Sequence, residues 1–102
     1  MLEIRPNCEL CEKALPVDSL EACICSYECT FCATCVESVL QNVCPNCGGG
    51  FEFRPVRPKT ARRNGVSALD HKPSTKKIVT KFSRDEIADF SESIKDIAPE
   101  AR

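Results

Sequence analysis

Two cysteine-rich stretches decide how this chain folds: Cys29-Thr30-Phe31-Cys32-Ala33-Thr34-Cys35 and, beginning nine residues after Cys35, Cys44-Pro45-Asn46-Cys47. Each contains a Cys-x2-Cys turn, which places two thiolates close enough to share one metal ion. Two such turns supply the four sulfur ligands of a tetrahedral zinc site, with Zn–S bonds of about 2.3 Å. The same spacing also suits a disulfide framework or a redox pair, so the rest of the chain must distinguish these alternatives.

The distribution of cysteines favours metal binding over disulfides. All nine lie between Cys8 and Cys47, in the first half of a 102-residue chain. Residues 1–7 have neither the basic segment nor the apolar run of a secretion signal, and no apolar run is long enough to span a membrane. We therefore expect a cytoplasmic protein without a membrane segment, in which reduced thiols bind zinc.

The size of the cysteine-rich part makes metal necessary for folding. A module of about 50 residues buries too little apolar surface to offset its chain entropy without cross-links. A structural zinc ion contributes roughly 10–16 kcal/mol of apparent binding energy, which appears as folding energy. We expect little structure in residues 8–47 when metal is absent.

Hydrophobic patterns predict short elements around the cysteines. Residues 20–24 largely alternate and predict a short strand, Thr30-Phe31 predicts a second, and residues 51–53 predict a third. A helix of two to three turns is predicted before Pro45, because four apolar residues recur at helical spacing. These four residues are Val36, Val39, Leu40 and Val43.

The cysteine spacing resembles that of a RING finger. Four pairs follow one another, with Cys29 at a position where that family commonly has His. The eight ligands implied by this resemblance are Cys8, Cys11, Cys25, Cys29, Cys32, Cys35, Cys44 and Cys47. Residues 1–58 resemble more closely a small bacterial, cysteine-rich family of unknown function that is described as RING-like. That likeness rests on Arg5-Pro6-Asn7-Cys8, on the string Ile-Cys-Ser-Tyr-Glu-Cys-Thr-Phe-Cys at 24–32, and on Arg-Pro-Val-Arg-Pro at 54–58.

The RING resemblance implies a small α+β fold stabilised by two zinc ions in a cross-braced arrangement. The first and third cysteine pairs would hold one Zn²⁺ and the second and fourth pairs the other, around a short β-hairpin and one short helix. Cys23 is the ninth thiol and could compete as a ligand. We expect it instead to be a small buried hydrophobic residue, as free cysteines often are.

Charge and composition divide the chain into three parts. Residues 1–53 are predicted to form the RING-like zinc-binding domain, 54–81 a basic flexible linker, and 82–102 an amphipathic C-terminal helix. The net charge is −5 over residues 1–50, +7 over 51–81 and −3 over 82–102. The linker composition is typical of a solvated segment, and the alternatives are docking onto the acidic zinc domain or weak nucleic-acid contact. The candidate phosphate contacts are Arg54, Arg57, Arg62 and Arg63.

The C-terminal part carries a clear helix signal. Ser83-Arg84-Asp85-Glu86 is a capping box, after which apolar residues recur at spacings of three, four and three before Pro99. The apolar stripe consists of Ile87, Phe90, Ile94 and Ile97. A helix of about 14 residues is marginal alone in water, so the stripe needs a partner surface. That surface is the zinc domain, a second copy of the chain or a partner protein.

No catalytic constellation is present, and a zinc ion held by four thiolates has no open position for water. The sequence therefore predicts a non-enzymatic, zinc-binding protein-interaction module with an unknown protein partner. One alternative is a ubiquitin-ligase-type RING adaptor, for which Leu10 and Pro45 match contact positions while the frequent helix Trp is missing. The other alternative is nucleic-acid binding through the basic linker. His71, the only histidine, is expected to be exposed without a ligand role.

Overall fold

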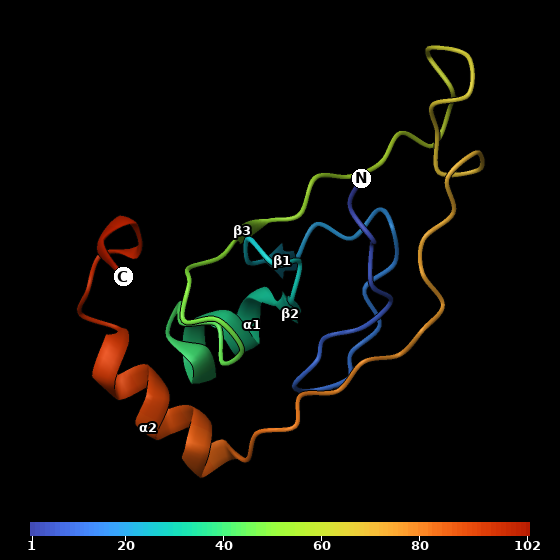
Figure 1. Ribbon diagram of the computed structural model, residues 1–102. Coiled ribbons are helices and arrows are strands. Elements are labelled where there is room, and N and C mark those ends of the chain that lie inside the picture. Colours follow the sequence, from blue (N-terminus) through green and yellow to red (C-terminus); the bar gives the residue numbers. More distant parts are fainter.

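A three-stranded antiparallel sheet lies at the centre of the computed structural model, which describes residues 1–102 (Figure 1). Its strands are β1 (Ala22–Ile24), β2 (Thr30–Cys32) and β3 (Glu52–Phe53), in the order β2-β1-β3. In the central strand, Cys23 pairs with Phe31 on one side and with Phe53 on the other. The three strands predicted from alternating side chains are confirmed, and the protein is a small α+β fold.

The helical segment after β2 is short. α1 (Ala33–Cys35) continues directly into the π-helical turn η1 (Val36–Leu40), so the predicted helix is confirmed over residues 33–40. Gln41 and Asn42 end it with left-handed φ angles of 51° and 59°. This reversal leaves Val43 outside the helix but still buried, although its spacing had assigned it to the helical face.

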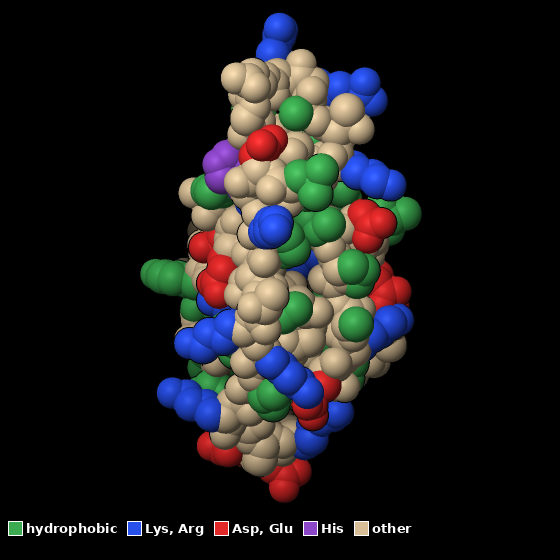
Figure 2. Space-filling view, turned by 90° about the vertical axis from the view of Figure 1, so that its right-hand side faces the viewer, with side chains coloured by type: hydrophobic (Ala, Val, Ile, Leu, Met, Phe, Trp, Pro, Cys, Tyr) green, Lys and Arg blue, Asp and Glu red, His purple; other side chains and the backbone are tan.

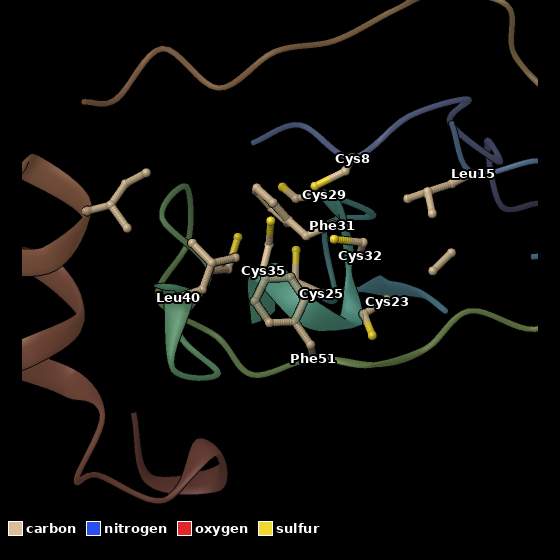
Figure 3. Close-up of a cluster of buried hydrophobic side chains, with 13 residues drawn as sticks. Cys8, Leu15, Cys23, Cys25, Cys29, Phe31, Cys32, Cys35, Leu40 and Phe51 are labelled. Carbon is tan, nitrogen blue, oxygen red and sulfur yellow. The ribbon is translucent and has the colours of Figure 1, made fainter. Parts of the chain in front are cut away.

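Cysteine side chains make up much of the core (Figure 3). The core cluster contains 13 buried residues, and seven of them are cysteines. The two aromatic residues of the cluster, Phe31 and Phe51, meet edge to face with ring centroids 5.5 Å apart. Because the core has so few large apolar side chains, its packing depends on the interactions between the cysteine sulfur atoms.

The C-terminal helix α2 (Arg84–Ile94) begins at the predicted capping box. The backbone N–H of Glu86 donates to Ser83 Oγ at 3.1 Å, and the backbone N–H of Ser83 donates to the Glu86 carboxylate at 3.0 Å. The helix packs against η1 of its own chain, and Ile87 is 1 % exposed within the core cluster. It ends at Ile94 and is shorter than predicted, so Ile97 of the predicted stripe lies beyond the helix and is 42 % exposed. Pro99 begins the short 3-10 turn η2 (Pro99–Ala101). The chain contains no helix with the length and apolar character needed to cross a bilayer.

Residues 54–81 contain no helix or strand, and they lead out into a projecting loop before returning beside the N-terminal segment (Figure 1). On the return, the backbone N–H of Ser74 donates to the carbonyl of Ile4 at 3.0 Å. The backbone N–H of Thr80 donates to the carbonyl of Glu9 at 2.7 Å. The segment predicted as a linker therefore lies against the cysteine-rich part of the chain.

Two of the four arginines named as candidate phosphate contacts bond to carbonyls of their own chain. Arg54 is 4 % exposed, and its guanidinium donates to the carbonyls of Arg5, Leu15 and Pro16 at 2.8–3.2 Å. Arg57 donates to the carbonyls of Leu2 and His71, both at 2.7 Å. A guanidinium carries five N–H donors. In Arg54 the two terminal nitrogens donate to loop carbonyls, while the buried Nε–H has no partner.

Replacement of Arg54 tests this structural role. Arg54→Met keeps an apolar side-chain stem but removes the guanidinium donors. Because buried carbonyls lose their partners, it should lower the free energy of unfolding by about 3 kcal/mol. Arg62→Met, at an exposed position, is the matched control and should change stability by less than about 0.5 kcal/mol. Thermal denaturation of both variants in the presence of zinc measures the difference. Equal effects of the two substitutions would contradict the assignment.

Candidate metal centres

The first group of sulfur atoms joins the N-terminal loop to the end of the hairpin. The Sγ atoms of Cys8, Cys11, Cys32 and Cys35 all lie within 4.8 Å of one another. Cys11 Sγ and Cys32 Sγ are 3.8 Å apart. Four sulfurs around one ion at about 2.3 Å have edges of about 3.8 Å in a regular tetrahedron. The separation fits a shared ion, whereas a disulfide would bring two sulfurs to about 2.05 Å.

The N-terminal loop is fastened to β2 by its own backbone and by Glu9. The backbone N–H of Glu9 donates to the carbonyl of Thr30 at 2.9 Å. The Glu9 carboxylate, 2 % exposed, accepts hydrogen bonds from the backbone N–H of Thr30 and from Arg5. Burial raises the pKa of Glu9, and those two hydrogen bonds oppose the rise. This carboxylate was not identified from the sequence, because a charged residue inside a Cys-x2-Cys turn carries no pattern that predicts burial.

The second group lies between the β1–β2 turn and the last cysteine pair. The Sγ atoms of Cys25, Cys44 and Cys47 lie within 4.8 Å of one another. Gly48, with a φ of 80°, turns the chain so that the Gly49 backbone N–H points at Cys47 Sγ at 3.4 Å. Backbone N–H groups also point at Cys25 Sγ, from Tyr27 at 3.3 Å, and at Cys8 Sγ in the first group, from Cys11 at 3.5 Å. Such donors favour the thiolate over the thiol, as metal binding requires.

Cys29 lies beside the second group without belonging to its closely spaced set. Hydrogen bonds from the thiols of Cys29 and Cys44 hold the pKa of Cys25 well below its usual range. The same contacts with Cys25 and Cys29 raise the pKa of Cys44. The Cys29 thiol therefore lies close enough to two members of the group to shift their pKa values. Its role as the fourth ligand stays a prediction.

Cys23 belongs to neither group. It is 5 % exposed on β1, and Figure 3 shows its sulfur pointing away from those of Cys25 and Cys32. Burial raises its pKa, so the neutral thiol is favoured there. All nine cysteines are free, with no disulfide between any two of them.

The two groups draw on alternating cysteine pairs along the chain. Cys25, of the second group, lies in the sequence between the two pairs of the first group, 8/11 and 32/35. The pair 32/35 in turn lies between Cys25 and the last pair, 44/47. Each group therefore closes a long stretch of chain. The first stretch contains the β1–β2 hairpin, and the second contains α1 and η1. The RING-like cross-brace inferred from resemblance is the pattern in which such alternation occurs, and it stays a proposal.

These features define a small cysteine-rich α+β protein with two groups of thiols able to bind metal ions. Residues 1–57 match the family described as "Protein of unknown function (DUF1272)", and this chain belongs to that family. An uncharacterized protein, R02474, of Rhizobium meliloti (strain 1021) is 60 % identical over 58 residues, which are 57 % of this chain and 69 % of that protein. No solved structure matches the chain. The family match contains all nine cysteines and stops before the returning segment and α2.

Paired substitutions test which thiols bind metal. Cys29→Ala removes the sulfur predicted as the fourth ligand of the second group, so the variant should bind fewer than two ions. Cys23→Ala is the matched control, since its sulfur lies outside both groups, and it should leave two ions bound. Native mass spectrometry of protein purified without chelator counts the ions directly. An unchanged count for Cys29→Ala would remove Cys29 from the ligand set.

Proposed function

We propose that this chain is a non-enzymatic, RING-like protein-interaction module that binds two Zn²⁺ ions. The observation that supports it is the presence of two all-cysteine groups taken from alternating pairs of the sequence. Sets of four cysteines are the ligands of structural zinc sites. Soft sulfur ligands at tetrahedral spacing suit zinc better than the hard cations magnesium or calcium.

The residues present fit this metal. Cys8, Cys11, Cys32 and Cys35 would hold one ion; Cys25, Cys44 and Cys47 would hold the other with Cys29 as the fourth ligand. Zinc bound in this way supplies folding energy and no catalytic position, because the coordination shell is filled by protein sulfur. We therefore assign the ions a structural role.

An interaction role is supported by apolar side chains left on the surface. Leu20 and Leu69 are 85 % and 76 % exposed, and Phe53 on the edge strand β3 is 64 % exposed. A further groove of about 360 Å³ lies between the N-terminal residues and the projecting loop, where Leu2, Ile4 and Val66 line it. The contiguous apolar lining of this groove makes it the candidate site of protein contact.

The ubiquitin-ligase alternative gains little support. Leu10 is half-buried against the core and Pro45 is buried. Phe82 and Phe90 line a groove together with Pro45, so the C-terminal part of the chain lies over one of the two contact positions that a ligase would use. The surface in question is already in contact with its own chain.

Nucleic-acid binding gains little support either. Arg54 and Arg57 bond to carbonyls of their own chain, which leaves Arg62 and Arg63 as the exposed pair. Figure 2 shows Lys and Arg side chains spread along one face with Asp and Glu between them, and they do not form one basic patch. Phosphate binding depends on several positive charges acting together.

Metal content and chelation test the proposal. Protein purified without chelator should contain two zinc ions per chain by native mass spectrometry and elemental analysis. Removal of zinc with a chelator should abolish the amide protection of residues 8–47, because the thiol-rich core has too few large apolar residues to persist alone. Readdition of zinc should restore protection. A folded, metal-free chain would contradict the proposal.

A further inference from the structure

The zinc-binding part of the chain holds residues 74–80 as an extended peptide. Three backbone positions of that segment, Ser74, Ile78 and Thr80, make hydrogen bonds to Ile4, Asn7 and Glu9 in that order. Both segments therefore run in the same direction, side by side. Because these bonds use the peptide backbone of residues 74–80, they depend on its extended conformation more than on its side chains.

Asn7 makes the most specific of these contacts. Its side-chain amide donates to the Ile78 carbonyl at 2.8 Å, and its Oδ1 accepts the Ile78 backbone N–H at 3.3 Å. Asn7 is only 5 % exposed, and its amide also donates to the Cys8 carbonyl at 3.0 Å. One side chain thus pairs with both backbone polar groups of a single residue, Ile78, and is itself fixed beside a cysteine of the first group.

Charge complements this backbone recognition. Residues 72–81 contain four lysines and no acidic residue, whereas residues 1–50 carry a net charge of −5. Four thiolates around a Zn²⁺ ion add roughly −2 for each site. Lys77 Nζ lies 2.6 Å from Glu12 Oε1. A basic peptide is therefore the class of ligand that this surface favours.

Apolar contacts extend the docked segment toward α2. Phe82 packs against the core cluster, and Ile87 is buried within it. Beside them, a groove of about 350 Å³ lies between Pro45 and Phe90. The residues that receive the segment all fall within 1–57, which match the family, and the docked segment lies entirely outside that match.

We propose that residues 4–12 form a binding site for a basic, extended peptide and that residues 74–80 of the same chain occupy it. The site rests on the proposed function, because Cys8 and Cys11 must be held by metal for residues 4–12 to keep this shape. In the intact chain the site is blocked by its own segment. An outside peptide of the same chemistry binds only when that segment is released.

Release of the segment within the full-length chain tests the proposal. The double variant Ile78→Pro with Thr80→Pro removes both backbone N–H donors that face Asn7 and Glu9. A fluorescent peptide with the wild-type sequence of residues 72–82 should bind this variant at least tenfold more tightly than it binds the wild-type chain. Fluorescence anisotropy measures both affinities. The control peptide carries the same two proline substitutions and should not bind.

Two further measurements make each outcome decisive. Asn7→Ala in the double-variant chain should abolish peptide binding, and Asn7→Ala alone should increase amide exchange at Ile78 and Thr80. Failure of the double variant to bind the peptide, with two zinc ions still counted by native mass spectrometry, would overturn the peptide site and leave the proposed function intact. A wild-type chain that contains no zinc when purified without chelator would instead overturn the proposed function. If sedimentation shows that the wild-type chain is a dimer and the Ile78 amide is protected from exchange, a second copy supplies the segment. That result would overturn the proposal that the chain blocks its own site.

Discussion

The mutual approach of cysteine sulfurs is the constraint on which the rest of this structure depends. Sulfurs about 4 Å apart repel one another once they are thiolates, and buried thiols of this number give little apolar packing. A shared cation removes the repulsion and fixes the distance. The strands, two or three residues long, and the helical segment of residues 33–40 are too short to persist alone. The secondary structure here follows from the positions of the sulfurs.

The local features of this fold were predictable because their signals lie within a few residues of one another. The capping box at Ser83 fixes the start of α2, and alternation identifies the strands around Cys23 and Phe31. The end of the first helix was predicted too far along the chain, before Pro45, because apolar spacing continues to Val43 while Gln41 takes a left-handed conformation. The spacing of apolar residues indicates which side chains are buried, but it does not show whether a helix or a chain reversal buries them.

The buried polar residues were beyond prediction from the sequence. Arg54 resembles the other arginines of a basic segment, and its burial depends on carbonyls supplied by residues 5, 15 and 16. Asn7 and Glu9 acquire their partners from residues 78 and 30. Nothing local to these three residues encodes those contacts. The metal-binding groups were easier to anticipate, since Cys-x2-Cys turns are local, although the position of Cys29 was taken from resemblance alone.

The alternation of cysteine pairs also governs how metal leaves. Cys25 lies in the sequence between the two halves of the first group, and Cys32 and Cys35 lie between Cys25 and the last pair. When one site loses its ion, the chain segment that positions ligands of the other site is no longer held in place. A protein with one ion therefore has no half that stays folded independently. With both groups holding zinc as proposed, its departure should be concerted, and the fully loaded chain and the empty, unfolded chain should be the two dominant species. A cell in which zinc is scarce would then contain folded chains with two ions and unfolded chains with none, and few chains with one ion.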